Sequence, residues 1–202
     1  MNNKILLLDI CGTITKDNTT MKYLETIGIK PKYYERVLGS VLWRFFSIDY
    51  LRKKILKQLK GCKIEQLSDA AKEYVASMSF NNEVLEKVEE YRRNGYEIIL
   101  VSATLDVIAS EIAQRIKAKG YYASSLQIRN GICSGRLEID LLNNKTSYVE
   151  HLLKENTTLM ISDNLGDLSL MIRCNQCLAI VCNDRNKKFW INKDIKYIKI
   201  NS

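Results

Sequence analysis

Three apolar runs in the sequence each end in a polar side chain, at the point where a buried strand would meet solvent. These runs and the residues that follow them are 5–8 with Asp9, 98–101 with Ser102, and 159–161 with Ser162 and Asp163. Lys145 follows the pair Asn143-Asn144 at a predicted helix start. Carboxylates, a hydroxyl group and a lysine that converge at one edge of a sheet would bind Mg²⁺ and a phosphate group. These positions are therefore the first candidates for a functional site.

The elements that must position these residues alternate along most of the chain. From residue 83 onward, apolar periodicity and turn signals predict a regular succession of helices and strands. The predicted helices are 83–93, 105–118, 145–154 and 165–172, and the predicted strands are 97–102, 121–128, 158–162, 178–182 and 195–200. The Asn130-Gly131 pair predicts a small hairpin. Strands separated by helices indicate a parallel sheet covered on both faces, in which ligands bind beyond the carboxyl ends of the strands.

The segment between the first strand and residue 81 has a different pattern. Residues 17–80 show apolar positions repeating at steps of three and four, which indicates helices throughout. This segment is therefore predicted to be a helical insertion after the first strand.

Four motifs, in order and spacing, resemble those of the haloacid dehalogenase superfamily. They are Asp9-Ile10-Cys11-Gly12-Thr13, Ser102, Lys145, and the segment Asp163 to Asp167. Ser134-Gly135-Arg136-Leu137 is similar to a hairpin of the phosphoserine-phosphatase-like branch, whose helical cap also follows the first motif. The resemblance implies a Rossmann-like α/β fold with a doubly wound parallel sheet. It also implies a core domain of residues 1–16 and 81–202 and a helical cap domain of residues 17–80.

The resemblance also implies a role for each motif residue. Asp9 would attack phosphorus and form an aspartyl phosphate, and Lys145 would neutralise the nucleophile and the transferring oxygens. Mg²⁺ is the implied cofactor, bound by Asp9, the backbone carbonyl of Cys11 and Asp163. Asp167, the fourth residue of this metal site, would orient either the waters on the metal or Lys145. The implied phosphate-binding groups are the Ser102 hydroxyl, Lys145 and the backbone near Ala103, Gly12 and Thr13.

Two positions depart from the family pattern. Active phosphatases of this family usually carry a second Asp where this chain has Cys11, and that Asp acts as general acid and then general base. Losing such help typically costs about 10² to 10⁴ in rate, so we expect a slow enzyme. Asn18 replaces the Glu that binds the substrate ammonium in phosphoserine phosphatases, which argues against phosphoserine as the substrate. A catalytically inactive or attenuated protein that binds a phosphorylated ligand or a protein partner is the alternative.

Charge limits the choice of partners. The 202 residues carry a formal net charge of +8, and residues 17–80 hold 12 Lys and Arg against 7 Asp and Glu. Such an excess favours anionic partners. We expect a small phosphorylated substrate and no nucleic acid; a lipid-phosphate phosphatase at acidic membranes stays open as an alternative, although peripheral membrane contact is not expected. The apolar runs are too short for a membrane helix, and a cytoplasmic location is expected.

Overall fold

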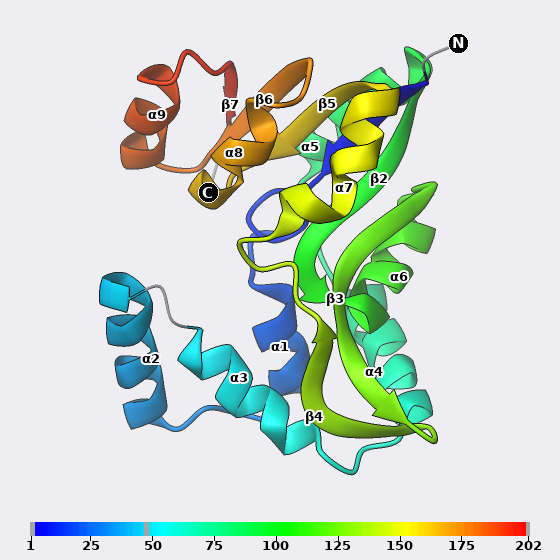
Figure 1. Cartoon of the computed structure of the whole chain (residues 1–202), viewed down its shortest axis with the longest axis vertical. Coiled ribbons are helices and arrows are strands. Elements are labelled where there is room, and N and C mark those ends of the chain that lie inside the picture. The colour runs from blue at the N-terminus through cyan, green and yellow to red at the C-terminus, as the bar shows by residue number, and fades with distance from the viewer. Residues whose placement is uncertain (1–2, 47–48, 201–202) are drawn as a thin grey trace.

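The computed structural model describes residues 3–46 and 49–200, and its centre is a seven-stranded sheet (Figure 1). The strands are β1 (Lys4–Leu8), β2 (Tyr96–Leu105), β3 (Gly120–Arg129), β4 (Ile132–Ile139), β5 (Thr157–Ser162), β6 (Gln176–Val181) and β7 (Tyr197–Lys199). Their order across the sheet is β4-β3-β2-β1-β5-β6-β7, and every neighbouring pair is parallel except β3 with β4. The predicted doubly wound, Rossmann-like α/β fold is confirmed.

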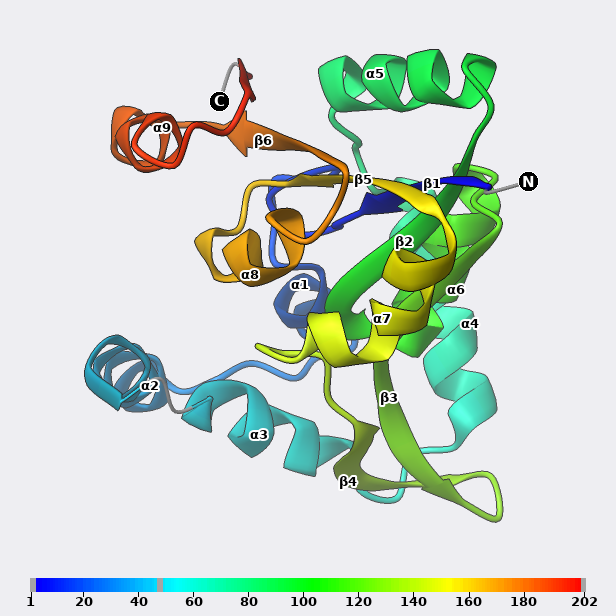
Figure 2. The same cartoon turned by 45° about the horizontal axis from the view of Figure 1, so that its top comes forward.

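Helices occupy both faces of this sheet and the insertion after β1 (Figure 2). They are α1 (Thr19–Thr26), α2 (Tyr33–Phe46), α3 (Tyr50–Leu56), α4 (Ile64–Ser77), α5 (Asn82–Arg93), α6 (Asp106–Arg115), α7 (Lys145–Glu155), α8 (Leu168–Met171) and α9 (Asp184–Ile191). Short 3₁₀ turns cover Lys57–Leu59 and Leu165–Asp167.

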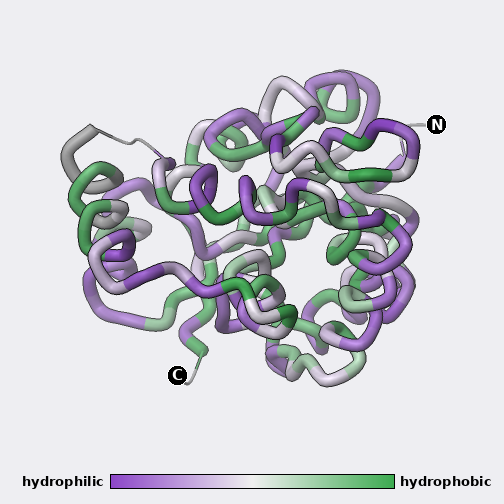
Figure 3. Tube along the Cα trace, turned by 90° about the horizontal axis from the view of Figure 1, so that it is seen from below, coloured by the Kyte–Doolittle hydropathy of each residue, from purple (hydrophilic) through white to green (hydrophobic). Residues whose placement is uncertain are grey.

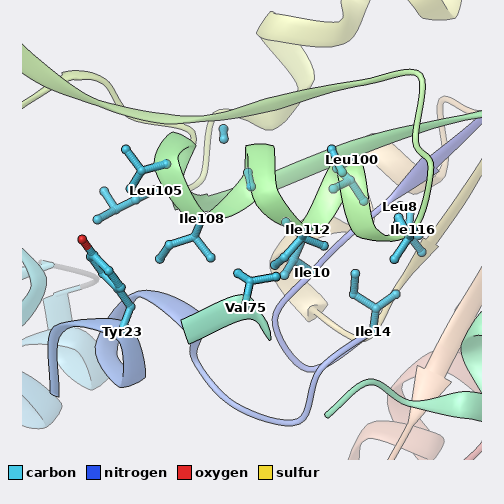
Figure 4. Close-up of a cluster of buried hydrophobic side chains, with 14 of the residues drawn as sticks. Leu8, Ile10, Ile14, Tyr23, Val75, Leu100, Leu105, Ile108, Ile112 and Ile116 are labelled. Atoms are coloured by element: carbon cyan, nitrogen blue, oxygen red, sulfur yellow. The ribbon is translucent and has the colours of Figure 1, made fainter. Parts of the chain in front are cut away.

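The alternation of side chains in β1 explains why helices cover both faces of the sheet. Leu6 and Leu8 belong to one buried apolar cluster, whereas Ile5 and Leu7 belong to another on the opposite face. Side chains of α4, α5 and α6 complete the first cluster, part of which is drawn in Figure 4, and side chains of α7, α8 and α9 complete the second. A strand that is apolar on both faces must lie in the middle of the sheet, which places its end at the centre of the molecule.

The helical insertion is attached to the rest of the chain through the β3–β4 hairpin. The Gly61 amide donates to the Cys133 carbonyl, and the Cys133 amide donates to the Cys62 carbonyl, each at 2.9 Å. In addition, α4 packs along α6. The hairpin turn itself is as expected, since Asn130 and Gly131 both have positive φ. The division into a core domain and a cap domain of residues 17–80 stays a prediction.

The predicted elements from residue 83 onward are present, with ends that differ by a few residues. The predicted helix 105–118 ends earlier, at Arg115, and Lys117 adopts a φ of 53°. The helix α9 was not predicted. Its residues Asp184–Ile191 are mostly polar, and its large apolar side chains are consecutive instead of three or four positions apart.

Within the described residues, no helix is both long enough and apolar enough to cross a membrane.

Candidate active site

The candidate site lies where β1 is flanked by β2 and β5. Leu8 is in register with Leu100 of β2 and with Ile161 of β5, so the three strands end at the same edge. Asp9 directly follows β1, and its amide donates to the Ile161 carbonyl at 3.0 Å. This is the point at which the sheet order reverses, and the sequence-predicted polar residues meet there.

A buried ion-pair cluster forms the floor of the site. The Nζ atom of Lys145 donates to Asp9 Oδ1 at 2.8 Å and to Asp167 Oδ2 at 2.7 Å. The Ser162 hydroxyl donates to the same Asp167 oxygen at 2.7 Å. Asp9 and Lys145 are only 3% and 7% exposed. Lys145 is the first residue of α7, and its side chain reaches Asp9 at the end of β1.

The two carboxylates determine the protonation of the lysine. Burial by itself would lower the pKa of Lys145, but Asp9 and Asp167 raise it above its ordinary value. Burial and the proximity of Asp9 raise the pKa of Asp167, and this rise is opposed by Lys145. Two roles were expected for Asp167, namely to orient the waters on the metal or to orient Lys145. Its contacts match the second role.

Asp163 is the third carboxylate of the site. Its Oδ1 accepts from the Thr13 hydroxyl at 3.1 Å, and burial together with Asp9 raises its pKa to about 7. Gly12 makes room for it: Gly12 has a φ of +74°, and an added Cβ would overlap the Asp163 carboxylate. The cluster therefore holds three carboxylates against the single ammonium of Lys145.

This donor set fits Mg²⁺, because oxygen ligands and an excess of negative charge are what the ion requires. Among the described residues, no three acidic, cysteine or histidine side chains form a metal-binding group by themselves. A site in which Mg²⁺ takes one or two carboxylates, a backbone carbonyl and water stays a prediction.

Cys11 lies in a network of hydroxyl groups. Its Sγ atom is 3.1 Å from Thr19 Oγ1 and 3.3 Å from Thr104 Oγ1, and the Thr19 amide donates to it at 3.4 Å. Burial, and secondarily Asp9, raises the pKa of the Cys11 thiol. The thiol is therefore neutral at physiological pH and is a poor general base. Thr19 and Thr104 were not identified from the sequence, because nothing in their local pattern links them to Cys11.

The candidate phosphate-binding residues are brought together only in part. Ser102 Oγ is 3.1 Å from Thr104 Oγ1 and accepts from the Thr104 amide, and Ser102, Ala103 and Gly12 line the same cavity. Thr13 is buried, and its amide donates to the Ile10 carbonyl at 3.3 Å. Its hydroxyl donates to Asp163, so Thr13 orients that carboxylate, and Thr13 is not among the residues that line the cavity.

A cavity of about 840 Å³ opens over the cluster. Asp9, Cys11, Lys145, Asp163 and Asp167 line its inner end. Further lining residues come from the end of β2, from the loops at 142–143 and 164–166, from Asn186 of α9, and from the insertion, including Asn18, Arg36 and Arg52. This volume is in the range of small-molecule sites. Asn186 could not be found from the sequence, since α9 itself was not predicted.

Comparisons with known proteins agree with this geometry. Residues 6–171 match the family model described as haloacid dehalogenase-like hydrolase. A structure of a protein with unknown function from Bordetella pertussis Tohama I is 16% identical, with a TM-score of 0.80 over 98% of this chain and 99% of that chain. No curated protein matches the chain.

Two solved phosphoserine phosphatases are also similar. A phospho-aspartyl intermediate analogue of phosphoserine phosphatase has a TM-score of 0.72 at 18% identity, over 100% of this chain and 95% of that chain. A substrate-bound phosphoserine phosphatase has a TM-score of 0.70 at 19% identity, over 97% and 100%. These likenesses confirm the resemblance to the phosphoserine-phosphatase-like branch at the level of the fold.

Proposed function

The chain belongs to the haloacid dehalogenase-like hydrolase family, and from this membership we propose that it is a slow, Mg²⁺-dependent phosphatase of a small phosphomonoester. The observation that carries the proposal is the buried Asp9–Lys145–Asp167 cluster beside Asp163, at the base of a cavity of about 840 Å³. A cytoplasmic location remains part of the proposal.

In the first half-reaction, a carboxylate oxygen of Asp9 attacks phosphorus, and the bond from phosphorus to the leaving oxygen breaks. Lys145 holds Oδ1 of Asp9, and among the described residues the one hydrogen-bond contact of Oδ2 is with the Ser162 hydroxyl, at 3.5 Å. Oδ2 is therefore the oxygen left to react. The Ser102 hydroxyl and the amides near Ala103 and Gly12 would hold the phosphate oxygens.

In the second half-reaction, water attacks the phosphorus of the aspartyl phosphate and regenerates the Asp9 carboxylate. The water must lose a proton, and the neutral thiol of Cys11 accepts one poorly. For a substrate whose leaving group departs without a proton, such as an aryl phosphate, we therefore assign the slow step to this hydrolysis.

Asp9, Asp163 and the Cys11 carbonyl would hold Mg²⁺, with Asp167 beside them. The ion would supply positive charge that lets a carboxylate approach a phosphate group.

Calorimetric titration with Mg²⁺ tests the cofactor directly. The unmodified protein should give a binding heat that disappears in Asp163→Ala, because that variant loses a carboxylate of the site. Asp69→Ala is the matched control, since it removes an exposed carboxylate of α4 outside the site and should leave the heat unchanged. No binding to the unmodified protein would favour the inactive alternative.

The inactive alternative is supported by Cys11 itself. A protein that binds a phosphorylated ligand without turnover would keep Lys145 and the phosphate-binding segment at Ser102 but would need no general acid. It predicts that a panel of phosphorylated metabolites stabilises the protein thermally while none is hydrolysed with Mg²⁺. Release of phosphate from any member would reject it.

A second candidate, a phosphatase at acidic membranes, is favoured by the orientation of α2. Among the described side chains of this helix, Glu35 is buried and the exposed ones are largely apolar; the green positions of the helix are visible beside the grey trace in Figure 3. The exposed side chains include Tyr33, Tyr34, Leu38 and Val41. Apolar and aromatic side chains on a basic segment suit a membrane interface. Failure to co-sediment with anionic vesicles at physiological salt would eliminate this candidate.

A further inference from the structure

Arg52 of α3 connects the helical insertion to two separate parts of the sheet edge. Its Nη1 donates to Asp140 Oδ1 at 2.7 Å, and its Nη2 donates to the Ala103 carbonyl at 2.8 Å. Nη1 also lies 3.5 Å from Asp49 Oδ2. The side chain is only 11% exposed, although Arg52 is 51 residues from Ala103 and 88 residues from Asp140.

Both distant partners lead directly to the candidate active site. Ala103 follows Ser102 at the end of β2, in the predicted phosphate-binding segment. Asp140 begins the loop that ends at Lys145, and its Oδ1 also accepts from the Leu142 amide at 3.0 Å. One guanidinium therefore fixes the loop before Lys145 relative to the irregular end of β2, which carries Ser102.

An arginine at the wall of this cavity has an obvious other use, which is to bind an anionic group of the substrate. The contacts of Arg52 argue against that use. Its charge is already offset by Asp140 and Asp49, and two of its nitrogen atoms are engaged in charge-assisted hydrogen bonds. A second anion would have to compete with partners that belong to the chain itself.

We propose that Arg52 is a positioning residue that clamps α3 onto the core and holds the irregular end of β2, which carries Ser102, in register with the loop before Lys145. It acts through these two segments and does not bind the substrate. The kinetic consequence of the clamp rests on the proposed phosphatase function, whereas its effect on the two segments does not.

Amide hydrogen exchange of the ligand-free protein tests the clamp independently of activity. Arg52→Ala and Asp140→Asn should each speed exchange in residues 49–56 and 140–144 by about tenfold, the change expected for loss of one charge-assisted hydrogen bond. The double variant should exchange no faster than Arg52→Ala, because both changes break the same contact. Arg52→Lys should behave like Arg52→Ala, since an ammonium cannot contact both partners in the forked geometry.

Lys54→Ala is the matched control, because Lys54 is an exposed cation two residues away on the same helix. It should leave exchange unchanged. Unchanged exchange in both Arg52→Ala and Asp140→Asn would overturn the clamp. Should Arg52→Ala fail to fold, Asp140→Asn and Arg52→Lys still decide the question.

Kinetics with an aryl phosphate separate positioning from substrate binding, because this leaving group offers no second anion. Arg52→Ala and Asp140→Asn should both lower kcat by about tenfold or more while KM changes little, as expected for misplaced reacting groups. Unchanged kcat in both variants on this substrate would overturn positioning, and a raised KM in Arg52→Ala with an unaffected Asp140→Asn would make Arg52 a ligand of the phosphate group itself. If the variants show faster amide exchange but the unmodified protein shows no phosphatase activity, the clamp is supported and the proposed function is rejected.

Discussion

At the scale of single residues, the surroundings of Cys11 are those of a hydrogen-bond acceptor. The Thr19 amide and the hydroxyls of Thr19 and Thr104 all lie within 3.4 Å of its sulfur atom. Thr19 is the first residue of α1, and the start of a helix favours negative charge. A carboxylate at position 11 could therefore accept these hydrogen bonds, whereas the sulfur of a thiol is only a weak acceptor.

Gly12 provides a residue-scale prediction about Asp163. Gly12→Ala should lose Mg²⁺ binding, because the new Cβ would displace the Asp163 carboxylate. Calorimetry with Mg²⁺ measures the loss. Gly95→Ala is the control, since Gly95 also has a positive φ, of +84°, but has no atom within 4 Å of an added Cβ. Both variants should lose about 1 kcal/mol to backbone strain, and only Gly12→Ala should lose binding. Equal binding by the two variants would contradict this placement of Asp163.

Three of the site residues found from the sequence share one property. Asp9 and Asp163 each follow a buried strand and Ser102 lies near the end of another, and the order of the strands brings them to one edge. Partners such as Thr104 and Asp140 could not be found, because their contacts with Cys11 and Arg52 join segments that are 93 and 88 residues apart in the sequence.

At the scale of elements, periodicity predicted the succession of helices and strands but not α9 or the orientation of α2. In α9, Phe189, Trp190 and Ile191 are consecutive, and only Trp190 is fully buried. In α2, the helical repeat was correctly identified, yet the described apolar side chains Val37, Leu38 and Val41 are exposed. A periodic pattern indicates a helix, but it does not show which other elements pack against that helix, because this depends on the tertiary structure.

Trp190 tests how α9 is attached. Its side chain is completely buried in the second apolar cluster, and its Nε1 has no hydrogen-bond partner among the described residues. Trp190→Ala should lower the free energy of unfolding by about 3–5 kcal/mol. Trp190→Phe should cost clearly less, because removing an unsatisfied buried N–H returns about 1–3 kcal/mol. Urea denaturation measures both, and equal losses in the two variants would contradict the unsatisfied state of this nitrogen.

At the scale of the whole molecule, the charge of +8 attracts anions of many kinds, so it cannot by itself select a partner. We expect it to serve a small phosphorylated substrate and not nucleic acid. Fluorescence anisotropy should show no submicromolar binding to random-sequence single strands or duplexes at physiological salt. Tight binding that weakens steeply as salt is added would overturn this expectation, since counterion release is typical of nucleic-acid contacts.

The central claim is that Asp9 attacks phosphorus while Cys11 fails to activate water, and rapid-mixing kinetics with an aryl phosphate test it most directly. Because this leaving group departs without a proton, the unmodified protein should release a burst of about one product per active site and then turn over slowly. Cys11→Asp should raise the steady rate by about 10² or more and remove the burst. Cys11→Asn, which matches the shape of Asp without its charge, should stay slow, and Asp9→Asn should abolish both phases. A Cys11→Asp protein no faster than the unmodified one would contradict the account.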